Sequence, residues 1–220
     1  MNGWNLDYWK SDDWKIVQER LIKLEAEGVT ICPGLARIDR ALHDVPLSSV
    51  RVVIVGQDPY PDSRFATGHA FSIPSSFGSV QFPATLREIF REYVSDLGYQ
   101  TPSSGNLKKW YDQGVLLWNA IPTLEACRSM SHDWNEYVAL TSEVIRKVGQ
   151  RGVVFCFLGA VARRYVSCVT DDNNSILETG HPSPRGNASS NTPFKGSRIF
   201  SRMNDALNEQ GLHPIDWRLE

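Results

Sequence analysis

Four short strand-like runs, rich in β-branched and aromatic side chains, recur along the chain between longer stretches of helical spacing. They cover residues 51–55, 115–119, 153–158 and 175–179, and each ends at a glycine or a polar residue. Runs of this length are typical of strands that are buried on both faces of a parallel sheet. Apolar residues spaced three and four apart predict helices over residues 13–27, 35–43, 83–97, 106–113, 135–150, 160–167 and 197–210.

The alternation of these strands and helices predicts an α/β fold in which a parallel sheet carries helices on both faces. In open sheets of this kind, ligands bind outside the carboxyl ends of the strands. Five residues stand at those strand ends: Gln57, Asp58, Asn119, Gly159 and His181. We therefore expect their side chains and backbone to converge on one crevice.

Three segments between the predicted elements carry no regular pattern. Residues 57–78 form a long loop, and loops of this length inside a compact domain are usually functional. Residues 122–133 show no clear element, and residues 187–192 are predicted as a polar, mobile loop. Thr85 stands where its hydroxyl can cap the helix over 83–97.

The composition indicates a globular protein with one domain over residues 1–220. Of the 220 residues, 41% are hydrophobic and 22% are charged, and the formal net charge is −2. A chain with this balance contacts nucleic acid only through a local basic patch. Six basic residues give the C-terminal half such a bias: Arg163, Arg164, Arg185, Lys195, Arg198 and Arg202. Solvated surface charge is the commoner explanation for residues of this kind.

Cysteine spacing and the lack of long apolar runs bear on the cellular compartment. The four cysteines are widely spaced and show neither a metal-ligand pattern nor a paired one. No run approaches the roughly 20 apolar residues that cross a membrane, and the polar N-terminus does not resemble a signal peptide. We expect a reduced intracellular compartment and a bacterial or viral source.

Three polar residues at strand ends each permit a functional and a structural interpretation. Asp58 can orient water or stabilise positive charge on a reacting carbon, but aspartates also cap turns. Asn119 offers one acceptor and two donors to a planar amide-bearing ligand, or it satisfies a neighbouring backbone. His181, held between Gly180 and Pro182, can donate to a developing oxyanion, although a lone histidine is more often structural.

Aromatic residues and short turns near these positions also permit two interpretations. Tyr60 and Phe71 lie in the long loop and can stack on bases, or they anchor that loop to the core. The loops at 74–79 and 182–186, together with Thr85, can grip a phosphodiester or form ordinary turns. The sequence has no phosphate-binding glycine loop, no nucleophile elbow and no metal-ligand run.

Taken together, these residues resemble the family 1 uracil-DNA glycosylases. The segment 56–60, followed by 68–72, is similar to that family's water-activating motif and its stacking phenylalanine. Residues 116–119 resemble its uracil-reading strand end, and 181–184 resemble its DNA-intercalation loop. Three later segments are also similar to the family: 194–196, 200–201 and 214–217. The resemblance extends over nearly the whole chain in the expected order.

The resemblance implies a single domain, a three-layer α/β/α sandwich with a central four-stranded parallel sheet, that needs no metal or other cofactor. It implies a monofunctional enzyme that flips uracil out of DNA and cleaves its N-glycosidic bond. This reaction leaves an abasic site and begins base excision repair. The expected substrate is single- or double-stranded DNA that contains uracil. A monomeric state, a proteinaceous glycosylase inhibitor as a partner, no membrane association, and a cytoplasmic location (nuclear in a eukaryotic host) are expected as well.

The same resemblance implies roles for individual residues. Asp58 would orient the attacking water and stabilise the oxocarbenium-like sugar, and His181 would hydrogen-bond uracil O2 as negative charge develops there. Asn119 would pair with uracil N3–H and O4, which cytosine cannot match. Tyr60 would fill the space that a thymine methyl group needs, and Phe71 would stack on the flipped base.

Gln57 would help to hold the base and the water. The expected DNA contacts are Thr85, Gly159, Ala160, Ser183, Pro184 and Arg185. Three departures from the family pattern occur. Pro61 replaces a histidine, Arg185 replaces a leucine wedge, and the pairs 84–85 and 159–160 replace Pro-Ser and Gly-Ser phosphate contacts. We expect uracil excision to be retained, with an altered preference between single- and double-stranded DNA.

Two other functions remain open from the sequence. A DNA-binding or protein-docking relative that has lost its chemistry would account for Pro61, but the intact Asp58, Asn119 and His181 argue against it. A glycosylase for another base is the second alternative, and Asn119 and Tyr60 both favour uracil instead. Alkali treatment of the DNA after incubation distinguishes the three functions. A uracil glycosylase leads to strand breakage at uracil, a glycosylase for another base leads to breakage at that base, and a relative without chemistry leads to no breakage.

Overall fold

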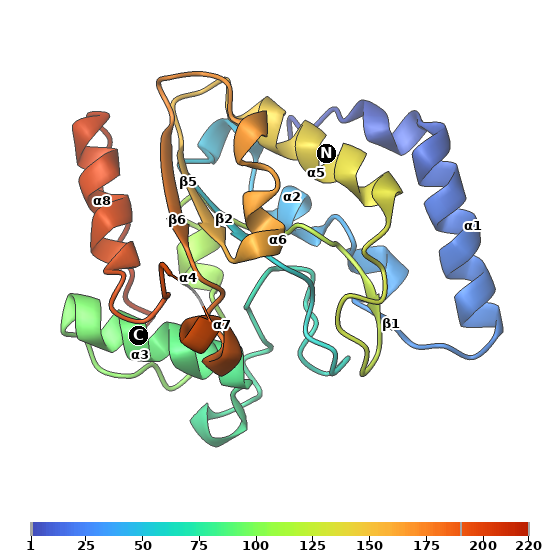
Figure 1. Cartoon of the computed structure of the whole chain (residues 1–220), viewed down its shortest axis with the longest axis horizontal. Helices are drawn as coiled ribbons and strands as arrows, with labels where there is room; N and C mark the ends of the chain where they lie inside the picture. The colour runs from blue at the N-terminus through green and yellow to red at the C-terminus, as the bar shows by residue number, and fades with distance from the viewer. Residues whose placement is uncertain (1, 190, 220) are drawn as a thin grey trace.

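Four parallel strands form the centre of the computed structural model, which describes residues 2–189 and 191–219 (Figure 1). The strands lie in the order β3-β2-β5-β6. Their bounds are Val52–Gly56 for β2, Val115–Asn119 for β3, Val154–Leu158 for β5 and Ser175–Thr179 for β6. The predicted α/β fold with four parallel strands is therefore confirmed.

Successive side chains of the strands enter two separate hydrophobic cores. Val53 and Val55 of β2 pack into one core, whereas Val52 and Ile54 of the same strand pack into the other. All five residues of β2 are buried, as are all five of β3 and of β5. Burial on both faces explains why these runs are almost continuously apolar in the sequence.

Helices cover each face of the sheet, as Figure 1 shows. On one side lie α1 (Asp12–Ala26), α2 (Arg40–Asp44), α5 (Asn135–Val148) and α6 (Ala160–Arg163). On the other side lie α3 (Ala84–Leu97), α4 (Lys108–Tyr111) and α8 (Ile199–Glu209). Short 3₁₀ helices occur at Asp7–Lys10, Leu35–Arg37, Leu47–Ser49, Ser79–Gln81 and Val166–Cys168.

The short predicted helices are less regular than the apolar spacing suggested. The helix expected over 35–43 divides into a 3₁₀ turn and α2, and the helix expected over 160–167 divides into α6 and a 3₁₀ turn. The segment 122–133 contains β4 (Leu124–Glu125), which pairs antiparallel with β1 (Ile31–Cys32). A pair of two-residue strands is too short to produce a periodic pattern in the sequence.

Two local predictions are wrong. Residues 187–189 do not form part of a loop, because α7 covers Pro184–Ser189; residue 190 of the predicted loop lies outside the described residues. Proline is favoured in the first turn of a helix, and the Ser183 hydroxyl accepts a hydrogen bond from the Gly186 backbone at 3.0 Å. Thr85 does not cap α3: the cap position is Pro83, which makes no side-chain cap bond.

The segments after β6 that resemble the glycosylase family belong mainly to the core. Phe194, Phe200 and Trp217 are buried in the hydrophobic core that contains α3 and α8. The buried Glu92 carboxylate of α3 accepts backbone hydrogen bonds from Gly196 at 2.5 Å and Arg198 at 2.7 Å. These contacts fix the turn that follows α7.

Candidate active site

The carboxyl ends of the central strands bring the predicted residues to one edge of the sheet. Gly56, the last residue of β2, lies opposite Asn119 of β3 in the parallel register. The pairing continues beyond the strands, because Ile121 donates its backbone N–H to the Gln57 carbonyl at 2.8 Å. Gly159, after β5, donates to the Thr179 carbonyl of β6 at 2.9 Å. Each strand end is thus fixed to its neighbour.

Hydrogen bonds hold both oxygens of the Asp58 carboxylate. Its Oδ1 accepts from Gln57 Nε2 at 3.1 Å. Its Oδ2 accepts from the Ser129 hydroxyl at 2.6 Å and from the Met130 backbone N–H at 2.7 Å. Gln57 Nε2 also lies 3.4 Å from Ser129 Oγ. These bonds fix the plane of the carboxylate just beyond the end of β2.

The loop that supplies two of these donors has an unusual backbone. Cys127 and Met130 adopt φ angles of 65° and 64°, which non-glycine residues rarely do. The Cys127 N–H donates to the Pro61 carbonyl at 2.9 Å, so the loop is tied to the chain just after Tyr60. Strained backbone of this kind clusters at functional sites.

Sequence reasoning missed Ser129. The residue belongs to a segment without periodicity, and a serine in a polar loop carries no distinguishing signal. The one available signal was its place in the chain. Ser129 lies ten residues after Asn119, in a loop that must return past the ends of β2 and β3.

Asn119 and Phe71 pack closely against Gly56. A Cβ at Gly56 would lie 2.7 Å from Phe71 Cζ and 3.1 Å from Asn119 Oδ1, so only glycine fits there. Asn119 is 8% exposed, and its Oδ1 has no hydrogen-bond partner among the described residues. A buried acceptor without a partner is costly in a native protein unless a ligand satisfies it.

Tyr60 is tied to the backbone of Phe71. Its hydroxyl donates to the Phe71 carbonyl at 3.0 Å, and Phe71 itself adopts a φ of 65°. Burial raises the pKa of the Tyr60 phenol, so the hydroxyl remains a neutral donor. The bond fixes the tyrosine ring relative to the phenylalanine that packs against Gly56.

His181 packs against Gly159 across the ends of β5 and β6. A Cβ on Gly159, which has a φ of +93°, would lie 2.9 Å from the His181 Cβ. The imidazole centroid lies 6.5 Å from that of the Phe71 ring, at 51° to it. Burial lowers the pKa of His181, and the negative charge of Asp58 acts in the opposite direction. The imidazole is therefore neutral at pH 7 and can donate one N–H.

A crevice of about 740 Å³ lies next to these residues, and Gln57, Ser129, Gly159 and His181 are part of its walls. Its walls include predicted residues and others that the sequence did not single out: Gln57, Ser129, Gly159, Ala160, Arg163, Gly180, His181, Ser183, Arg185, Gly186, Asn191 and Thr192. Arg163 and Arg185 give it a local basic character despite the net charge of −2. Among the described residues, six of the predicted site residues do not line this crevice: Asp58, Tyr60, Phe71, Thr85, Asn119 and Pro184.

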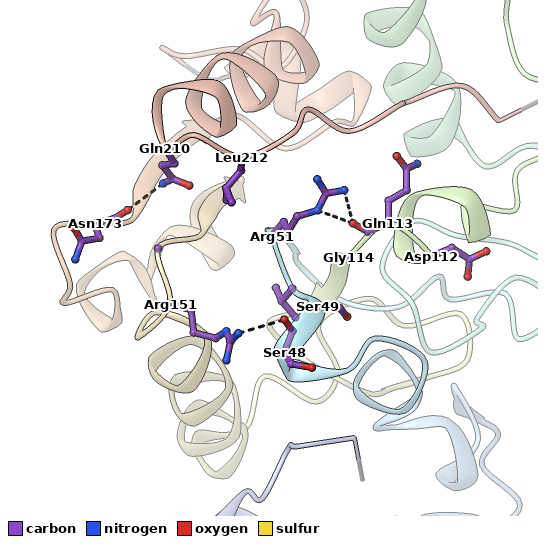
Figure 2. A pocket seen from close by; sticks show the side chains of 12 residues that line it. Ser48, Ser49, Arg51, Asp112, Gln113, Gly114, Arg151, Asn173, Gln210 and Leu212 are labelled. Carbon is purple, nitrogen blue, oxygen red and sulfur yellow. Dashed lines mark hydrogen bonds between the residues drawn. The ribbon is translucent and has the colours of Figure 1, made fainter.

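A second cleft, of about 790 Å³, lies at the opposite ends of the strands (Figure 2). Its most prominent side chain, Arg51, donates to the Gln113 carbonyl at 3.0 and 2.8 Å and to the His213 carbonyl at 2.7 Å. Arg151 donates to the Ser48 carbonyl at 3.3 Å. These side chains satisfy loop backbone, so we assign the cleft a structural role despite its size.

Within residues 2–189 and 191–219, no group of three or more histidine, cysteine, aspartate or glutamate side chains has an arrangement that would hold a metal ion. None of the helices described has the length and apolar character required to span a bilayer.

Fold and site together define an α/β protein whose strand ends bring an aromatic ring and a side-chain amide close to an oriented carboxylate and a neutral imidazole. The family model described as the uracil DNA glycosylase superfamily matches residues 42–208. The chain belongs to this superfamily.

Individual relatives agree with this assignment. The chain is 39% identical over 201 residues to a uracil-DNA glycosylase of Lachnoclostridium phytofermentans, covering 90% of this chain and 87% of the relative. It is 42% identical over 193 residues to a uracil-DNA glycosylase of Deinococcus deserti, covering 86% and 75% of the two chains. The crystal structure of mimivirus uracil-DNA glycosylase has the same fold, with a TM-score of 0.80 at 23% identity over 96% of this chain and 86% of the other.

The activity follows from the superfamily. The chain is a hydrolase of N-glycosyl bonds that excises uracil from DNA, the first step of base excision repair.

Proposed function

We propose that a uracil flipped out of the DNA is bound at the ends of β2 and β3, next to Phe71 and Asn119, where Asp58 and His181 act on its glycosidic bond. Asp58 orients the attacking water and stabilises the positive charge that develops on the sugar. A base inside a duplex cannot reach this crevice, so extrusion costs a few kcal/mol, and a mismatched pair lowers that cost. The hydrogen bonds to both Asp58 oxygens support this role, because they fix the carboxylate before the substrate arrives.

His181 donates a hydrogen bond to uracil O2 as the base leaves as an anion. The lowered pKa keeps the imidazole neutral, and a neutral imidazole carries one N–H that can donate. One preorganised donor to a developing anion contributes about 3–4 kcal/mol to the transition state. The tight packing of His181 against Gly159 supplies the preorganisation.

Asn119 carries the base selectivity. Its unpartnered, buried Oδ1 suits the N3–H of uracil, and its amide N–H₂ suits O4. Cytosine presents an acceptor at N3 and a donor at its exocyclic amine, so it leaves both groups of Asn119 unpaired. Such mismatches reach discrimination of roughly 10⁴-fold or more. The buried Asn119 oxygen beside the Phe71 ring is the observation that carries the proposed function.

The aromatic residues complete the pocket. Phe71 stacks on the flipped base, and Tyr60 occupies the space that the thymine methyl group would need. The bond from the Tyr60 hydroxyl to the Phe71 carbonyl supports a fixed spacing between these two rings. Gln57 holds the Asp58 carboxylate and contributes to the binding of the base and the water.

DNA binds along the crevice that surrounds the pocket. The proposed contacts are Thr85, Gly159, Ala160, Ser183, Pro184 and Arg185. Arg185 lies at the second position of α7 and lines the crevice, where it can fill the gap left by the extruded base and contact phosphate. The few basic side chains predict a small number of phosphate contacts and a correspondingly shallow dependence on salt.

Several properties of the family 1 enzymes complete the proposal. We assign the chain to family 1 on its motifs, and we propose a single-domain monomer that leaves the abasic site uncut and uses no metal or other cofactor. Among the relatives are bacterial proteins, which favours a cytoplasmic location. A mimivirus UNG variant has been solved in complex with UGI, and it shares the fold with a TM-score of 0.86 at 23% identity. We propose that a proteinaceous inhibitor of this kind binds the crevice.

A single-uracil oligonucleotide tests the function. The protein is incubated with it in EDTA, free uracil is measured, and the DNA is analysed before and after alkali. We expect free uracil and breakage at the uracil position only after alkali. Breakage before alkali would contradict the monofunctional assignment, and the absence of breakage after alkali would contradict the enzymatic one.

A further inference from the structure

We infer that Ser129 is a positioning residue that orients the Asp58 carboxylate for attack by water. The inference rests on the proposed role of Asp58. Ser129 belongs to the loop between β4 and α5, and its hydroxyl lies 2.6 Å from Asp58 Oδ2. The carboxylate oxygen can only accept, so the serine hydroxyl is the donor.

The number of hydrogen bonds at Asp58 explains how the Ser129 hydroxyl orients the carboxylate. An ionised carboxylate offers about four acceptor positions, two on each oxygen. Ser129 and the Met130 backbone N–H occupy both positions on Oδ2, and Gln57 occupies one on Oδ1. Within residues 2–189 and 191–219, one acceptor position remains without a donor, on Oδ1. A water bound there has a single defined location relative to the carboxylate.

The Ser129 hydroxyl is itself held in place. It lies 3.4 Å from Gln57 Nε2, which can donate to it, so the hydroxyl proton is directed at Asp58. The loop is anchored just before Ser129 by a bond that does not involve Asp58, in which the Cys127 N–H donates to the Pro61 carbonyl at 2.9 Å. The Ser131 Oγ accepts from the Glu125 N–H at 2.8 Å, a bond within the loop itself.

Loss of this hydroxyl would free one side of the carboxylate without removing it. Asp58 would keep the Met130 and Gln57 donors but could rotate about its Cβ–Cγ bond, which displaces the remaining acceptor position. Small misplacements of a reacting group cost up to about 100-fold in rate. Because Ser129 is exposed at the surface of the loop, its truncation to alanine leaves no buried cavity.

The test compares Ser129→Ala, Ser129→Thr and Ser131→Ala with the wild type, on the single-uracil oligonucleotide. We expect Ser129→Ala to lower kcat about tenfold with KM unchanged, and Ser129→Thr, which retains the hydroxyl, to recover the rate to within about threefold. Ser131→Ala removes a bond of the same loop that does not touch Asp58, and it should stay within about twofold of the wild type. In an Asp58→Asn background, Ser129→Ala should cause little further loss.

Three results would overturn the inference while the wild type remains active. These are an unchanged rate for Ser129→Ala, an equal loss for Ser131→Ala, and a full additional loss in the Asp58→Asn background. A wild-type chain that releases no uracil would instead overturn the proposed function, and this inference with it.

Discussion

Asn119 presents a buried amide oxygen, without a partner in the described residues, to the space beside Phe71. The amide lies at the end of β3, and the register with β2 places it opposite Gly56. Backbone pairing therefore fixes its position more firmly than any side-chain contact. Selectivity for the base therefore depends on which atoms of the Asn119 side chain donate hydrogen bonds and which accept them.

A change in the donors and acceptors of the side chain at position 119 should change the base that is excised. In Asn119→Asp, the side chain no longer donates to O4 but can accept from the exocyclic amine of cytosine. We expect cytosine release where the wild type shows none, together with slower uracil release. Oligonucleotides with a single target uracil or cytosine, cleaved with alkali, measure both.

Asn173→Asp is the matched control, since Asn173 lines the cleft at the opposite ends of the strands. It should excise uracil at the wild-type rate and release no cytosine. Cytosine release by neither variant, with uracil release intact in Asn119→Asp, would contradict the proposed role of Asn119.

The candidate residues were predictable where they follow a strand, and not where a loop supplies them. Asp58, Asn119 and His181 stand directly at strand ends, so the parallel sheet alone predicts that they meet. Ser129 reaches Asp58 from 71 positions away in the chain. Such a contact depends on the path of an irregular loop, for which the sequence has no periodic signal.

At the scale of elements, α7 is the main departure from the sequence prediction. Pro184, Gly186 and the polar residues that follow suggest a loop, but the segment Pro184–Ser189 is helical. The Ser183 side chain accepts the Gly186 N–H, and the helix contacts α3. Tertiary packing and one local cap thus override weak helix propensity. The helix presents Arg185 to the crevice from an ordered element rather than from a loop.

Arg185→Ala tests whether α7 carries a wedge. If the arginine fills the gap left by the extruded base, its loss should slow excision from duplex DNA about tenfold and from single strands by less than about threefold. Single-turnover rates on the two substrates measure the ratio. Arg163→Ala removes another positive charge from the crevice wall and should affect both substrates alike. Equal effects of Arg185→Ala on both substrates would contradict the wedge.

At the scale of the whole molecule, the fold was largely predictable because three of the four central strands are buried on both faces. Continuous apolar runs mark β2, β3 and β5, and the helices between them require parallel pairing. The sequence did not reveal the β1–β4 pair, whose two-residue strands join residues 31–32 to 124–125. This small sheet begins the segment that returns over Asp58. The β1–β4 pair and Ser129 were both missed for the same reason, because this segment has no periodic pattern in the sequence.

A buried histidine links global stability to pH. His132 is 0% exposed, its Nδ1 lies 2.8 Å from the Thr123 hydroxyl, and burial lowers its pKa to about 4. The unfolded chain binds a proton at this residue below about pH 6.5, whereas the folded chain does so only near pH 4. The stabilisation is thus fully present above about pH 6.5 and is lost as the pH falls towards 4, by about 3 kcal/mol in total.

Urea unfolding of wild type and His132→Gln at pH 7 and pH 5 measures this contribution. Between these two pH values, the wild type should lose about 2 kcal/mol more of its unfolding free energy than the variant, which cannot titrate at this position. His181 and the carboxylates are present in both proteins, so their contributions to the pH dependence of the unfolding free energy cancel in the comparison. Equal losses in the two proteins would contradict the buried, neutral state of His132.

The central claim is that Asp58 drives uracil release from a pocket that binds the base independently of it. The most direct measurement is the single-turnover rate of uracil release by wild type and Asp58→Asn in EDTA, with the DNA affinity of both proteins measured on the same oligonucleotide. We predict uracil release by the wild type and a rate lowered by about 100-fold or more in the variant, with affinities that agree within a few-fold. Equal rates of release by the two proteins would contradict the account.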